Sequence, residues 1–130
     1  MYEKAYELSN AILGSDVYKR FINARESLKK HEDLCAKANE YRHKNFIIQN
    51  STSNNRVDEL RELENEYRDI LRNTIVREYL NAELLLCRTI QKINEIIVDG
   101  LDMDIDFSYS SILKKFDNYL IILSNIRNEV

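Results

Sequence analysis

The sequence predicts an all-α protein, a bundle of five to six helices that includes a long antiparallel helical hairpin. Three observations support this fold class. The chain of 130 residues has two glycines and no proline, so proline interrupts no helix. Apolar residues recur at spacings of three and four, the helical period, in six segments. The length suits a single domain over residues 1–130, with a core that needs neither disulfides nor metals.

The first two predicted helices meet at a glycine. Apolar residues on one face predict a helix over residues 2–13, and we expect Gly14 to end it in the left-handed conformation. Ser15 can cap the next helix with its hydroxyl, and Asp16 suits the positive end of the helix dipole. The second helix then continues to about Leu28.

The third and fourth segments predict the hairpin. Helical periodicity covers residues 32–48, gives way to the polar stretch QNSTSNN at residues 49–55, and resumes over residues 57–71. A short polar loop between two such segments is typical of antiparallel helices. The apolar seam of the fourth segment lies far in sequence from the central helix, so we expect it to be buried against a second chain. The candidate interface residues are Val57, Leu60, Leu63 and Tyr67.

The fifth segment predicts the longest helix. We expect Asn73 or Thr74 to cap it, and it covers residues 75–98, about 36 Å at 1.5 Å per residue. Its apolar positions extend around much of the circumference, so we expect a central helix covered on several sides. Asp99 and Gly100 end it.

The C-terminal part of the chain has a different pattern. Residues 101–107, LDMDIDF, alternate apolar and acidic residues and predict a short extended linker. Residues 108–128 predict a last helix, so residues 108–130 would add a C-terminal helix to the region 1–107. The apolar residues of this helix are Ile112, Leu113, Phe116, Tyr119, Leu120, Leu123 and Ile126.

Two helix starts repeat one pattern. VYKRFINARESL begins at Val17 and IVREYLNAELLL begins at Ile75, and each follows a capping residue. True pseudo-symmetry and chance convergence of two amphipathic helices both explain the match. In either case the repeated apolar positions predict a core, with alanines that let helices approach closely. The predicted core residues are Val17, Phe21, Ala24, Leu28, Ile75, Tyr79, Ala82, Leu86, Ile90 and Ile93.

Charge and hydropathy exclude several classes of protein. The net charge of −3 argues against direct binding of nucleic acid, which usually requires a basic stripe. The basic clusters at residues 29–30, 42–44 and 114–115 are expected to be solvated helix faces. No apolar run approaches membrane-spanning length, and the N-terminal MYEKAYELSN is not a signal peptide. We therefore expect a cytoplasmic protein without a membrane partner.

Metal chemistry has weak support, and we expect no cofactor. The run DMDID resembles the start of a calcium loop, but the required glycine and glutamate positions hold Phe107 and Leu113. His31 and Cys35 can share a helix face, yet a structural zinc site needs two further ligands. Cys35 and Cys87 lie in apolar helical patterns typical of buried, reduced cysteines, and they are the weak candidates for a metal shared between subunits.

No catalytic residues are predicted, and we expect a protein that is not an enzyme. The sequence contains no glycine-rich phosphate loop, no Gly-x-Ser-x-Gly elbow and no His-Glu-x-x-His motif. The polar residues nearest to an apolar stripe are Asn23, Asn81 and Thr89. A helical enzyme with an unfamiliar site therefore has little support.

Two blocks resemble the YlbF/YmcA family of small helical bacterial regulators. SDVYKRFINARESLKK, residues 15–30, looks like the Ser-x-x-Tyr-x-x-hydrophobic-x-x-Ala helix of that family. NTIVREYLNAELLLCRTIQKINEII, residues 73–97, looks like its later long helix. The N-terminal AYELSNAI and the charged hairpin also fit, so that the resemblance covers residues 5–107.

The resemblance implies an all-α bundle that self-associates and has no enzymatic activity. Family members are implicated in competence, sporulation and biofilm formation, and some are accessory factors of RNase Y-dependent RNA processing. Some carry C-terminal cysteines associated with an iron–sulfur cluster, but this chain has no cysteine after Cys87. We therefore expect a homo-oligomeric regulatory protein that binds other proteins. The alternatives are a metal- or ligand-binding sensor using Cys35 and Cys87 across a subunit interface, or a structural helical module.

Overall fold

The computed structural model describes residues 1–101, and every structural statement below concerns these residues. The predicted linker and the predicted C-terminal helix lie in residues 102–130, outside the described part. The described residues form six helices, joined by short connections, and no strands, which confirms the all-α prediction. They are α1 (Tyr2–Leu13), α2 (Asp16–Lys29), α3 (Glu32–Gln49), α4 (Arg56–Glu66), α5 (Arg68–Arg72) and α6 (Thr74–Asp99).

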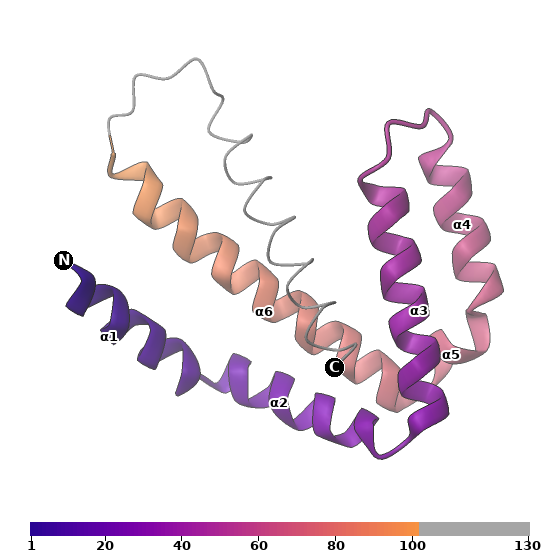
Figure 1. Cartoon of the computed structure of the whole chain (residues 1–130), viewed down its shortest axis with the longest axis horizontal. Coiled ribbons are helices and arrows are strands. Elements are labelled where there is room, and N and C mark those ends of the chain that lie inside the picture. The colour runs from indigo at the N-terminus through magenta and orange to yellow at the C-terminus, as the bar shows by residue number, and fades with distance from the viewer. Residues whose placement is uncertain (102–130) are drawn as a thin grey trace.

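The helices form two arms that meet at one end of the molecule (Figure 1). One arm is the antiparallel pair of α2 and α6, with α1 continuing beyond the start of α2. The other arm is the pair of α3 and α4, which lie side by side and run in opposite directions. The short helix α5 contacts α3, α4 and α6 and joins the two arms at their base.

The core lies between α2 and α6, where the two copies of the sequence repeat face each other. The rings of Phe21 and Tyr79, which occupy equivalent positions in the repeat, stack with centroids 5.8 Å apart. Ala24 and Ala82 are buried on the same faces, and their small side chains allow the two helices to approach closely. The complete buried cluster is Phe21, Ala24, Leu28, Ala38, Val76, Tyr79 and Ala82.

Two of the predicted helix caps are present, and α1 ends at Leu13 as predicted, but the predicted conformation of Gly14 is wrong. The Ser15 hydroxyl accepts a hydrogen bond from the Tyr18 amide, and the Asn73 side chain accepts hydrogen bonds from the amides of Ile75 and Val76. Gly14 does not adopt the left-handed conformation, because its φ is −86° and its ψ is −2°. The chain proceeds directly from α1 into α2 at this point, so it needs no left-handed reversal.

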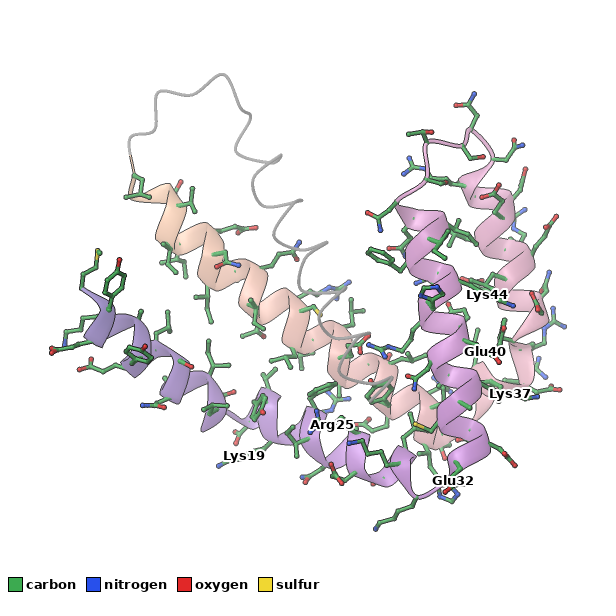
Figure 2. All side chains as sticks on the ribbon, in the orientation of Figure 1. Lys19, Arg25, Glu32, Lys37, Glu40 and Lys44 are labelled. Atoms are coloured by element: carbon green, nitrogen blue, oxygen red, sulfur yellow. The ribbon has the colours of Figure 1, made fainter. Side chains whose placement is uncertain are left out.

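The predicted fourth helix is broken at Tyr67. The Tyr67 backbone (φ −104°, ψ 21°) separates α4 from α5. Its side chain is buried, packs on Tyr41 with ring centroids 5.8 Å apart, and donates a hydrogen bond from its hydroxyl to Glu40. Lys44 lies over the Tyr67 ring, and Figure 2 shows Glu40 and Lys44 along the same helix, α3. These contacts hold Tyr67 against α3 while the following residues turn towards α6.

The expected cover of α6 is found along its first half. In the described chain that cover comes from α2, α3 and α5. Farther along the helix, large apolar side chains remain exposed, with 64% of Ile96 and 52% of Ile97 accessible to solvent. Residues 1–101 therefore do not surround α6 on several sides over its whole length.

Candidate functional site

A buried ion pair ties α3 to α6 where the two arms begin to separate. The Arg42 Nε donates to Glu83 Oε1 at 3.1 Å, and Nη2 donates to the other carboxylate oxygen. Nη1 donates to Asn39 at 3.1 Å, and the guanidinium lies 5.3 Å from the centroid of the Tyr79 ring. Arg42 is only 7% exposed, so the expectation that residues 42–44 form a solvated face is wrong for Arg42. Its charge is compensated by Glu83, and the pair links α3 to α6.

A groove of about 370 Å³ lies beside this ion pair, between α3 and α6. Its α6 wall includes Leu80, Leu84 and Cys87, which share one face of the helix. Its α3 wall includes Tyr41 and Phe46. Burial raises the pKa of the Tyr41 hydroxyl, and the negative charge of Glu64 raises it further. The groove is therefore mainly apolar and has neutral tyrosine at its edge, a surface that suits packing of another apolar segment.

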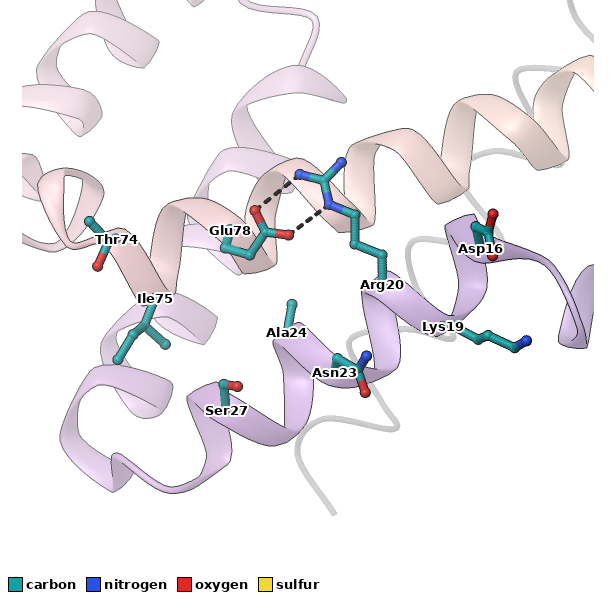
Figure 3. A pocket seen from close by; sticks show the side chains of 9 residues that line it. All are labelled: Asp16, Lys19, Arg20, Asn23, Ala24, Ser27, Thr74, Ile75 and Glu78. Atoms are coloured by element: carbon teal, nitrogen blue, oxygen red, sulfur yellow. Dashed lines mark hydrogen bonds and ion pairs between the residues drawn. The ribbon is translucent and has the colours of Figure 1, made fainter.

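A second, larger cleft of about 580 Å³ lies between α2 and the start of α6 (Figure 3). Arg20 bridges it with a bidentate pair to Glu78, at 2.7 Å from Nε and 3.0 Å from Nη2. The hydrogen bond between them lowers the pKa of the Glu78 carboxyl and raises that of the Arg20 guanidinium. A carboxylate held charged in this way is a poor general acid or base near neutral pH. The most prominent polar feature of this cleft is therefore a surface ion pair.

The most exposed apolar surface lies on α1 and at the end of α6. Not one residue of α1 is buried, although the helix carries an apolar stripe. Figure 1 shows α1 and the end of α6 on the same side of the molecule. We call these residues the distal apolar surface. Its large side chains are Tyr2, Tyr6, Leu8, Leu13, Ile96, Ile97 and Leu101.

The predicted interface residues on α4 differ in exposure. Leu63 and Tyr67 are 4% and 7% exposed, since α3 covers them within the chain. Leu60 is half-buried, and Val57 is 69% exposed. Among these four residues, Val57 offers the largest apolar area to a second chain.

The burial of the predicted core residues depends on where they lie along the contact between α2 and α6. Phe21, Ala24, Leu28, Tyr79 and Ala82 are buried, and Ile75 and Leu86 pack against the buried cluster. Val17, Ile90 and Ile93 lie towards the ends of the contact and are half-buried.

The two cysteines occupy different environments. Cys35 packs against the buried cluster from the start of α3, where its sulfur lies 3.8 Å from the Asn39 amide nitrogen. Cys87 lines the groove on α6. Across residues 1–101, histidine, cysteine and acidic side chains form no group of three or more that could hold a metal. The sharing of a metal by these cysteines between subunits remains a prediction.

No helix in the described part combines the length and the apolar character that crossing a membrane requires.

The pairing of Arg42 with Glu83 and the groove beside it were missed from the sequence. A signal was present, because Arg42 lies four residues after Ala38 and so falls on the apolar stripe of its helix.

Known proteins resemble this chain over most of its length. A family model described as "Control of competence regulator ComK, YlbF/YmcA" matches residues 1–102. A UPF0342 protein of Caldicellulosiruptor bescii is 30% identical over 105 residues, covering 78% of this chain and 88% of the relative. A UPF0342 protein of Desulfitobacterium hafniense is 32% identical, with 78% and 84% covered. One of Staphylococcus epidermidis is 27% identical, with 78% and 92% covered. No solved structure matches the chain.

Proposed function

Because the chain belongs to the YlbF/YmcA family, we propose that it is a non-enzymatic regulatory protein that acts through contacts with other proteins and with copies of itself. The observation that carries this proposal is the distal apolar surface. A helix that has an apolar stripe but no buried residue gains little from folding unless another surface covers it.

Self-association through the distal apolar surface follows from its composition and position. Tyr2 and Tyr6 on α1 are 74% and 72% exposed, and Ile96 on α6 is 64% exposed. Tyrosine is enriched at protein interfaces, and the buried centre of an interface is more apolar than the rest of the protein surface. Two copies that cover these residues reciprocally would form a symmetric dimer, the commonest closed assembly.

Light scattering coupled to size exclusion at high micromolar concentration tests self-association. We expect the wild-type chain to be larger than a monomer and the double variant Ile96→Lys, Ile97→Lys to be monomeric, because two charges would then lie in the contact. Val57→Lys is the matched control, since Val57 is 69% exposed on α4, outside the distal apolar surface. A wild-type chain that stays monomeric would refute self-association. Dissociation by Val57→Lys alone would assign the interface to α4.

The proposed regulatory role requires that the chain bind proteins other than copies of itself. We infer that the chain is an accessory factor in bacterial RNA processing or developmental regulation, in line with the competence control named in the family description. Affinity purification of the full chain from its native host, with the Ile96→Lys, Ile97→Lys variant in parallel, is the test. Recovery of RNA-processing proteins with the wild-type chain supports the role. Their equal absence from both preparations contradicts it.

A further inference from the structure

The groove between α3 and α6 is an apolar surface that the described chain leaves open. Its α6 wall, Leu80, Leu84 and Cys87, lies on a face different from the one that packs on α2. Leu84 is 49% exposed although it lies in the middle of the longest helix. Arg42 and Glu83 neutralise each other at the groove, so an apolar occupant would bury no uncompensated charge from this pair.

The chain itself supplies a segment of matching length and character. Residues 108–128 follow α6 in sequence and carry apolar residues at helical spacing on one face. As a helix they would extend about 31 Å, and the distance back along α6 from Asp99 to Leu80 is about 28 Å. Residues 102–107 are enough to reverse direction, because six residues span up to about 20 Å and packed helices lie about 8–10 Å apart.

We propose that residues 108–128 occupy the groove between α3 and α6 of their own chain, running antiparallel to α6. If Ser108 lies opposite Asp99, then Leu120 lies opposite Cys87 and Leu123 lies opposite Leu84, in the apolar part of the groove. The family match ends at residue 102, so this cover would be an addition to the matched region. The groove is distinct from the distal apolar surface, and this inference does not depend on the proposed function.

Two neighbouring leucines of α6 give a matched test on the groove side. Leu84 lines the groove and Leu85 does not, although both are exposed, at 49% and 39%. In the full-length chain, Leu84→Glu should release residues 108–128 and speed tryptic cleavage after Lys115 by at least about tenfold. Leu85→Glu should leave that rate unchanged. Equal rates in the two variants would overturn the proposal.

The alkylation rate of Cys87 tests the same contact through changes in residues 108–128. In the full-length chain, Leu120→Asp with Leu123→Asp should raise the rate of Cys87 alkylation by iodoacetamide by about tenfold or more. The Cys35 rate, read from the same digest by mass spectrometry, should not change. Asn118→Asp with Asn125→Asp adds the same charges on the opposite side of the predicted helix, and it should match the wild type.

Two results would overturn the proposal in this second experiment. One is a Cys87 rate that is equal in the wild type and in the variant at Leu120 and Leu123. The other is a slow alkylation of Cys87 in the wild type that becomes fast on dilution, because the groove would then be occupied by a second copy of the chain.

Discussion

Replacing Glu83 by alanine tests whether the ion pair between α3 and α6 holds the two arms together. Glu83 accepts from two nitrogens of Arg42, whose side chain is 6% exposed, while Glu83 itself is 22% exposed. The alanine variant keeps the arginine charge at the same buried place and removes both of these acceptors. Loss of one partner of a buried pair destabilises a protein far more than loss of the whole pair.

The magnitude follows from the burial of the two groups. Two unit charges about 4 Å apart attract each other by about 4 kcal/mol at an effective dielectric constant of 20. Water that reaches the partly exposed site of Glu83 recovers a part of this energy, and Asn39 and the Tyr79 ring still contact the guanidinium. We expect Glu83→Ala to lower the free energy of unfolding by about 2–3 kcal/mol.

Urea unfolding followed by circular dichroism at 222 nm measures this loss. The double variant Arg42→Met, Glu83→Leu should recover most of the stability, since it leaves no buried charge. Glu78→Ala is the matched control, because it breaks the Arg20–Glu78 pair, whose side chains are 44% and 48% exposed, and it should cost much less. Equal losses for Glu83→Ala and Glu78→Ala, or a double variant less stable than Glu83→Ala, would refute the reasoning.

Three further changes test the core, a cap and the surface ion pair. Ala38→Leu should cost about 1–3 kcal/mol in urea unfolding, because Ala38 is fully buried, while Leu at the exposed Ala36 should be nearly neutral. Asn73→Ala should cost about 1 kcal/mol by removing the cap of α6, and Asn73→Asp should retain it, so equal losses would contradict the capping role. The stability gained from Glu78 should be fully present at neutral pH and lost as the pH falls through its lowered pKa, below the ordinary range of a glutamate. The difference in unfolding free energy between the wild type and Glu78→Gln, measured from pH 7 to 3, checks this, and a constant difference would contradict it.

The helices and their caps could be predicted because local sequence determines them. Ser15 and Asn73 precede apolar periodic segments, and their side chains bond the amides that a helix start leaves unpaired. The repeated positions of Phe21 and Tyr79 predicted a core because both stripes had to be covered. The structure adds that these equivalent residues stack on each other.

The sequence places Arg42 on an apolar stripe, but it does not name the partner of Arg42 or predict the break at Tyr67. Both depend on contacts between segments distant in sequence. Tyr67 has the periodicity of a continuous helix, and contacts with Tyr41 and Glu40 on α3 fix its position. Arg42 stands in a basic cluster whose other members are exposed, and its partner Glu83 lies on another helix. The exposure of the distal apolar surface likewise depends on the angle between helices, which a stripe of apolar residues does not specify.

The separation of the two arms also bears on the order in which the chain folds. Contacts within the α3–α4 arm close the shorter loops, since Lys44 and Glu66 are 22 residues apart and Glu40 and Tyr67 are 27 residues apart. The contact between α2 and α6 joins Arg20 to Glu78 across 58 residues. Closing the longer loop costs more chain entropy and slows folding, unless the segment between has already become compact. We expect the α3–α4 arm to form early and to bring α2 and α6 together, so that the best-packed part of the molecule assembles last.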